Sequence, residues 1–201
     1  MTSAPKTLLQ LAGAIPTPPP LAESTVVVID AQREYTDGKL PLANVEPALA
    51  EIGKLLKRAR ALQIPVIHIQ HQGKPGGAFG PDTAGFEIAS PATPAPGEAV
   101  LHKSLPNAFA STDLASRLAA LKKPNVVLVG FMTHMCVEAT ARASIDLGFK
   151  ATVIASATAT RPLPDPLGGA ALTADEVQRN ALAAIADRFA TVAATVDSLP
   201  D

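Results

Sequence analysis

The stretch that most constrains the fold is residues 126–149, VVLVGFMTHMCVEATARASIDLGF. It opens as an uninterrupted apolar run ending at Gly130, which is typical of a buried strand in a parallel sheet. From Val137 to Gly148, apolar and small residues recur at spacings of three and four, which predicts a helix packed along one face. A strand followed at once by a helix indicates an α/β fold.

Cys136 is the only cysteine of the chain, and it falls at the turn between this predicted strand and helix. Open α/β sheets bind ligands outside the carboxyl ends of their strands. The positive end of a helix dipole also favours a thiolate. We therefore hypothesise that Cys136 is a catalytic nucleophile. The alternative is a small buried hydrophobic residue, the common role of an isolated cysteine in an alanine-rich core.

Two further ionisable residues are placed to act on this thiol. Asp30 ends the first predicted strand, and Lys103 precedes a predicted helix. Because the carboxyl ends of neighbouring parallel strands converge on one crevice, Asp30 could approach Cys136 and serve as proton acceptor and later as donor. A nearby lysine would favour the thiolate. Taken singly, Asp30 is equally consistent with a turn cap and Lys103 with a solvated surface charge.

Apolar runs and helical periodicity alternate along the rest of the chain, which predicts a three-layer, doubly wound, mainly parallel β-sheet with helices on both faces. Strands are predicted at 25–29, 65–70, 125–129 and 151–155, with an edge strand at 190–196. Helices are predicted at 46–63, 112–121, 137–148 and 173–189, the last starting with a capping box. The Gly- and Pro-rich residues 71–100 are predicted to be a long functional loop, with 73–80 as a flexible segment near the pocket.

The length of 201 residues suits one domain with its own core, so we expect residues 1–20 to form a Pro-rich arm and 21–201 a single domain. The net charge of −1 gives no electrostatic case for binding nucleic acid or an anionic membrane. No apolar run approaches the roughly 20 residues that span a bilayer. A single cysteine excludes an intrachain disulfide and fits a cytoplasmic location.

Three blocks of sequence occur in the order found in one known family. Residues 130–149 are similar to its motif G-x-x-T-x-x-C-V-x-x-T-A-x-x-A-x-x-x-G-[FY]. VVVIDAQREY is similar to the family's first-strand Asp-x-Gln-x-x-[FY], and KSLPNAFASTDL to its lysine block. From about residue 25 to 196 the chain resembles the isochorismatase-like cysteine hydrolases, which include nicotinamidases, N-carbamoylsarcosine amidases and ureidoacrylate amidohydrolases.

The resemblance implies a role for each of the three residues: Cys136 as nucleophile, Asp30 as base, Lys103 as supporting cation. It also implies a cis peptide between Phe131 and Met132, and an oxyanion hole made by the N–H groups of Met132 and Cys136. The implied reaction cleaves a C–N bond of a small amide or carbamoyl compound through a thioester, without a cofactor. Relatives commonly assemble as dimers, tetramers or larger rings, so we expect a homo-oligomer.

Substrate contacts are harder to assign. The resemblance and position suggest Gln32, Tyr35, Phe109, Thr133 and His134, with Phe79 as a further pocket wall. Nicotinamidases hold a metal through an Asp-x-His pair and a further histidine. Here His68 and His71 are three apart on a predicted strand and point to opposite faces, so no metal site is expected. Whether any of the chain's histidines (68, 71, 102, 134) lines the pocket stays open.

Two other functions remain consistent with the sequence. The chain could be a non-catalytic relative that binds a metabolite or serves in assembly, or its thiol could perform chemistry other than amide hydrolysis. The isochorismate-cleaving branch of the family lacks the cysteine, so Cys136 argues against a vinyl ether substrate. The identity of the substrate is not specified, because residues 71–100 carry no diagnostic pattern.

Overall fold

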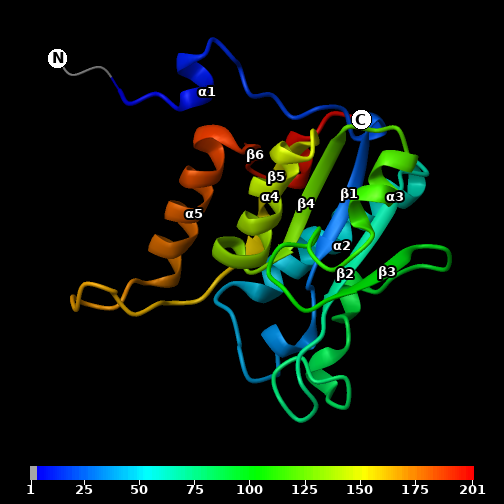
Figure 1. Cartoon of the computed structure of the whole chain (residues 1–201), viewed down its shortest axis with the longest axis vertical. Helices are drawn as coiled ribbons and strands as arrows, with labels where there is room; N and C mark the ends of the chain where they lie inside the picture. Colours follow the sequence, from blue (N-terminus) through cyan, green and yellow to red (C-terminus); the bar gives the residue numbers. More distant parts are fainter. Residues whose placement is uncertain (1–3) are drawn as a thin grey trace.

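The computed structural model describes residues 4–201 and contains one six-stranded, all-parallel sheet (Figure 1). Its strands, in the spatial order β3-β2-β1-β4-β5-β6, are β1 (Ser24–Ile29), β2 (Val66–His71), β3 (Ala99–Lys103), β4 (Asn125–Phe131), β5 (Lys150–Ala159) and β6 (Ala190–Ala193). Every residue of β1 is buried, as expected for a β-branched strand covered on both faces. The predicted doubly wound α/β fold is confirmed.

Helices cover both faces of the sheet. The helices are α1 (Leu8–Leu11), α2 (Val45–Ala61), α3 (Leu114–Ala120), α4 (Glu138–Asp146) and α5 (Ala174–Arg188). One apolar core joins α2 to the sheet, and a second joins the opposite face to α3, α4 and α5 (Figure 1). Short 3₁₀ turns occur at Leu21–Glu23, Arg33–Tyr35, Ala84–Phe86, Ser90–Ala92 and Val196–Ser198, and a π-helical turn at Thr133–Val137. The predicted capping box of Thr173 and Glu176 starts α5.

The strand order places the winding reversal between β1 and β4. From β1 the chain winds through β2 to β3 on one side, and from β4 through β5 to β6 on the other. Ligands bind open α/β sheets in the crevice outside the carboxyl ends of the strands at such a reversal. Asp30 directly follows β1, and Cys136 lies just beyond β4. The topology therefore brings these two residues to the same crevice.

The structure differs from the sequence prediction at several strand boundaries. β3 is not among the predicted strands; it begins at the end of the predicted 71–100 loop. Its residues alternate between buried and exposed, so the sequence shows only a short apolar pattern there. β4 continues to Phe131 and β5 to Ala159, both beyond their predicted ends. The extension of β5 consists mostly of alanine and serine, which carry little strand propensity by themselves. These extensions carry the chain to the carboxyl edge of the sheet, where the candidate residues gather.

The N-terminal arm and the Gly-rich segment each form hydrogen bonds in the structure. Within the arm, α1 forms one turn, and the N–H of Leu8 donates to Asp187 of α5 at 2.8 Å. Residues 1–3 of the predicted arm lie outside the described residues. In the 73–80 segment, the N–H of Gly73 donates to the carbonyl of Phe79 at 2.9 Å, and this hydrogen bond joins the two ends of the segment. No helix within residues 4–201 has both the length and the hydropathy needed to cross a membrane.

Candidate active site

Asp30, Lys103 and Cys136 meet at the carboxyl edge of the sheet, as predicted. The Nζ of Lys103 lies 2.7 Å from Oδ2 of Asp30 and 3.3 Å from Sγ of Cys136. Relative exposures are 0% for Asp30, 1% for Lys103 and 5% for Cys136. A buried carboxylate, ammonium and thiol in mutual contact can pass a proton without exchanging it with bulk water.

Two unusual backbone conformations build this edge. Asp30 has a φ of 48°, in the left-handed region that few residues other than glycine adopt. Gly130 has a φ of 113°, and a Cβ built there would lie 1.9 Å from the carbonyl oxygen of Ile29. Glycine is therefore required where β4 passes the end of β1. The two strands can end side by side only with this residue at position 130.

Cys136 sits in a π-helical turn rather than in a regular α-helix. The carbonyl of Met132 accepts from the N–H groups of Met135 at 3.0 Å and Val137 at 3.2 Å, and so passes over the N–H of Cys136. The peptide bond between Phe131 and Met132 is cis. Single π-helical turns are rare in proteins as a whole but common at functional sites, where they change the direction of one backbone group.

The electrostatics of the site oppose the thiolate, which the helix start and the lysine seen in the sequence are expected to favour. Burial, and then the carboxylate of Asp30, raise the pKa of Cys136 to about 12, with Lys103 opposing both. Burial also raises the pKa of Asp30 above its usual value, again against the effect of Lys103. The effect of Lys103 does not overcome desolvation. The resting thiol is therefore neutral, and it needs a general base to become the nucleophile.

This assignment predicts the ultraviolet absorbance of the thiolate. At pH 9, about three units below the thiol pKa, only about one molecule in a thousand carries the thiolate. The thiolate absorbance, taken as the difference between the protein and its Cys136→Ala variant, should therefore be absent up to that pH. In Asp30→Asn it should appear at lower pH, because the carboxylate that raises the pKa is gone. A wild-type titration midpoint near pH 7 would contradict the assignment.

Gln32 and Thr133, both predicted to touch substrate, are instead fully buried and bonded to the backbone. The amide of Gln32 donates to the carbonyls of His71 at 3.0 Å and Phe86 at 2.8 Å, and accepts from the N–H of His71 at 2.8 Å. The hydroxyl of Thr133 donates to the carbonyl of Ala159 at 3.1 Å. Both side chains hold strand ends in place, and their donor groups are used by these backbone contacts.

Tyr35 and Phe79, by contrast, lie against the site. The ring of Tyr35 packs edge-on against Phe79 with 5.1 Å between centroids, and against Phe131 at 5.7 Å. Burial and then the charges of Asp30 and Cys136 raise the pKa of Tyr35, which places its hydroxyl near the catalytic candidates. Phe79 has a φ of 56°, an unusual conformation for a bulky residue.

Phe109 is a weaker candidate than the sequence suggests. Its ring stacks on Phe149 with centroids 5.8 Å apart, and it packs against the core on the α3–α5 side. His134 is half-buried; its Nδ1 lies 2.5 Å from the hydroxyl of Thr160, while its Nε2 is buried without a hydrogen-bond partner among the described residues. Burial and then Arg161 lower the pKa of His134, so the ring is neutral at pH 7.

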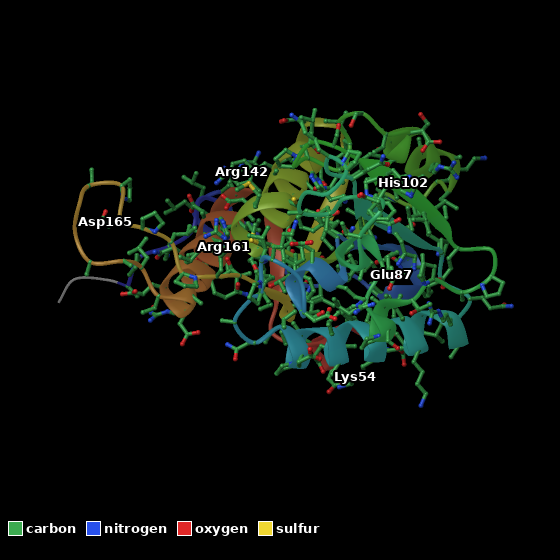
Figure 2. The ribbon with its side chains drawn as sticks, turned by 90° about the horizontal axis from the view of Figure 1, so that it is seen from below. Lys54, Glu87, His102, Arg142, Arg161 and Asp165 are labelled. Atoms are coloured by element: carbon green, nitrogen blue, oxygen red, sulfur yellow. The ribbon has the colours of Figure 1, made fainter. Side chains whose placement is uncertain are left out.

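Sequence reasoning missed the contributions of His71 and Arg161. Nδ1 of His71 lies 3.2 Å from Nζ of Lys103, a contact that follows from their pairing in register across β2 and β3. Figure 2, which looks onto the carboxyl edge of the sheet, shows Arg161 amid the strand ends and Asp165 far out on a protruding loop. Arg161 forms no ion pair within residues 4–201, and its buried Nε has no partner there.

The remaining histidines lie away from the catalytic candidates. Nε2 of His68 lies 2.9 Å from Oε2 of Glu98, and the ring of His102 packs edge-on against Phe86. Across residues 4–201, no three His, Cys, Asp or Glu side chains are grouped so as to hold a metal ion. The side chains that meet at the site are those of Asp30, Lys103 and Cys136.

Comparisons with known proteins agree on one family. The family model described as "Isochorismatase domain" matches residues 24–197. A relative named secreted isochorismatase effector, from Verticillium dahliae, is 37% identical over 187 residues, covering 92% of this chain and 95% of its own. The crystal structure of an isochorismatase from Pseudomonas putida superposes with a TM-score of 0.92 at 36% identity, covering 98% of this chain and 100% of that one. A ureidoacrylate amidohydrolase from Pseudomonas syringae is 29% identical over 172 residues, 68% of this chain and 70% of its own.

Proposed function

The chain belongs to the isochorismatase family and is a hydrolase, and from this premise we propose that it cleaves the C–N bond of a small amide or carbamoyl compound through a thioester on Cys136. The observation that carries the proposal is the buried contact of Asp30, Lys103 and Cys136, with 2.7 Å between Asp30 and Lys103. A thiol next to a carboxylate is suited to acyl transfer. The amidohydrolase relative favours the same bond type.

The first half of the reaction forms the thioester. Asp30, whose raised pKa makes it a stronger base than an ordinary carboxylate, takes the proton of the Cys136 thiol. The thiolate forms beside the ammonium of Lys103 and attacks the carbonyl carbon. The N–H groups of Met132 and Cys136 would receive the oxyanion, each contributing about 3 kcal/mol to the transition state. When the C–N bond breaks, its electron pair goes to nitrogen and the proton on Asp30 follows it.

The second half releases the acid. Asp30 is again a carboxylate, and it takes a proton from a water molecule as that water attacks the thioester carbon. The C–S bond then breaks, and the thiolate of Cys136 recovers the proton from Asp30. The products are a carboxylic or carbamic acid and an amine or ammonia. The enzyme returns to its starting protonation state without a cofactor.

Arg161 narrows the class of substrate. Its guanidinium lacks an acidic partner within residues 4–201 and lies close enough to His134 and Tyr35 to change the pKa of both. We therefore expect a substrate that carries a carboxylate or another anionic group. In Arg161→Gln, KM for an anionic amide should rise by about 10- to 100-fold, since a charged hydrogen bond is worth roughly 1.5–3 kcal/mol. KM for the matched neutral amide should stay constant; an equal rise for both would contradict this role.

Two further expectations accompany the proposal. We expect a homo-oligomer, which light scattering coupled to gel filtration would reveal. We also expect a cytoplasmic location, although the relative from Verticillium dahliae is named as secreted. Fractionation of the source cells tests the second expectation, and recovery of the protein from the medium would contradict it.

The function is tested by a screen of small amides, ureas and carbamoyl compounds for release of ammonia or amine. Anionic compounds and their neutral counterparts should be paired, and isochorismate should be included as a vinyl ether. We expect turnover of at least one C–N compound that disappears in Cys136→Ala. Hydrolysis of the vinyl ether that survives this substitution would overturn the proposal. Binding of an amide without any turnover would favour the non-catalytic alternative.

A further inference from the structure

The buried ammonium of Lys103 has three contacts, and only two of them belong to the proposed catalytic set. An ammonium has three N–H donors and no acceptor. Nζ of Lys103 lies 2.7 Å from Oδ2 of Asp30, 3.3 Å from Sγ of Cys136 and 3.2 Å from Nδ1 of His71. Three acceptor atoms therefore face three donors, Oδ2 of Asp30 as an ion pair and Sγ of Cys136 and Nδ1 of His71 as hydrogen-bond partners. Without the third contact, a fully buried cation would keep an unsatisfied donor, which is costly away from water.

The ring of His71 is held with its Nδ1 facing the ammonium of Lys103. Its own backbone is clamped on both sides by the amide of Gln32, at 2.8 and 3.0 Å. The ring packs edge-on against Phe79 with centroids 5.1 Å apart. Pairing of His71 with Lys103 across β2 and β3 sets the distance between the two side chains. Backbone, ring packing and register thus all fix Nδ1 in front of the ammonium.

The contact also determines the protonation state of the ring. An ammonium can donate to Nδ1 only if that nitrogen carries no proton, so the tautomer must be the one protonated at Nε2. Burial and then Lys103 lower the pKa of His71 to about 4, so the ring is neutral at pH 7 and its Nδ1 lone pair is available. Histidine here is an acceptor, not an acid or a base.

We propose that His71 is a positioning residue whose Nδ1 is the third acceptor that fixes the Lys103 ammonium between Asp30 and Cys136. The inference rests on the proposed function insofar as it concerns turnover. Lys103 holds the pKa of Asp30 and of the thiol below the values that burial would otherwise give them, and His71 acts on both groups by holding Lys103 in place. It does not touch the substrate in this role.

The test compares two nearly isosteric variants, His71→Asn and His71→Leu. Asparagine can place its amide oxygen where Nδ1 lies, whereas leucine offers no acceptor. The substrate-free readout is the rate of alkylation of Cys136 by iodoacetamide at pH 7.5. We expect a fall of roughly tenfold in His71→Leu, the equivalent of one hydrogen bond to a charged group, and a rate within about threefold of wild type in His71→Asn. His102→Ala, an exposed histidine on β3, serves as the matched control and should leave the rate unchanged.

Turnover gives a second readout. In His71→Leu, kcat should fall roughly tenfold with little change in KM, and the acidic limb of the kcat/KM profile should move to higher pH, because Lys103 no longer holds down the pKa of Asp30. His71→Asn should restore both. Equal rates in His71→Leu and wild type, or an equal loss in both variants, would overturn the inference. If no amide is turned over but alkylation follows the expected order, the proposed function fails while the role of His71 stands.

Discussion

Cys136→Ala should lower kcat/KM for the cleaved amide by at least about 10⁴-fold while leaving the fold intact. The thiol contacts Lys103 beside Asp30, and within residues 4–201 no second thiol or hydroxyl forms a hydrogen bond with this lysine. The deleted group is one sulfur atom in a π-helical turn, so the loss of unfolding free energy should be about 1 kcal/mol. Steady-state kinetics and urea unfolding measure the two effects separately.

A matched control comes from the same helical segment. Leu147 lies just after α4 and is 49% exposed, so Leu147→Ala removes an apolar side chain far from the thiol chemistry. It should keep wild-type kinetics. If Cys136→Ala retained a substantial share of activity, water rather than the thiol would be the nucleophile, and the thioester route would be wrong.

Lys103→Met should have the second-largest effect, because it leaves the Asp30 carboxylate buried without its cation. Breaking one side of a buried ion pair typically costs about 3–5 kcal/mol of unfolding free energy. The loss has a pH dependence whose sign follows from Asp30. Its pKa in the folded protein is already above 3.8 and rises further without Lys103. A carboxyl with a raised pKa stabilises the fold when protonated and destabilises it as the pH rises through that pKa.

The deficit of Lys103→Met relative to wild type should therefore be largest at neutral pH and shrink as the pH falls toward about 4. Adding Asp30→Asn to Lys103→Met should recover most of the lost stability at pH 7, since no buried charge remains, while activity stays absent. Urea unfolding of the two single variants and the double variant forms a complete cycle. A double variant as unstable as the sum of the single ones would contradict the ion pair as the cause.

The parts of the fold set by local sequence could be predicted. The apolar runs of β1 and β4 and the capping box at Thr173 are signals carried by consecutive residues, and the structure follows them. Asp30 and Cys136 could be paired in advance because parallel strands end at a common edge. Their meeting depends only on the alternation of strands and helices, which the sequence displays clearly.

The rest depends on contacts between distant segments. β3 is a short edge strand whose residues alternate in exposure, so it gives no sustained apolar run, yet it carries Lys103 into the site. His71 could not be linked to Lys103 without knowing the register of β2 and β3. Gln32 looks like a ligand-binding residue in the motif, and only the structure shows its amide bonded to the backbone.

The pKa of Cys136 is the clearest case of a property that the sequence leaves undetermined. A helix start and a lysine both favour the thiolate, and these two features are visible in the sequence. Burial opposes them, and its extent depends on how the whole edge of the sheet packs. In this protein burial prevails, so formation of the nucleophile depends on a base, the role predicted for Asp30.

The central claim is a covalent thioester on Cys136, and rapid-quench mass spectrometry of the protein during turnover tests it most directly. With a saturating amide substrate, quenching in acid should reveal a mass increase equal to the acyl group, mapped to the peptide that contains Cys136. Added hydroxylamine should divert part of the product to the hydroxamate, in a proportion that does not depend on the leaving amine. Steady formation of product with neither adduct nor hydroxamate, or an adduct on another residue, would contradict the account.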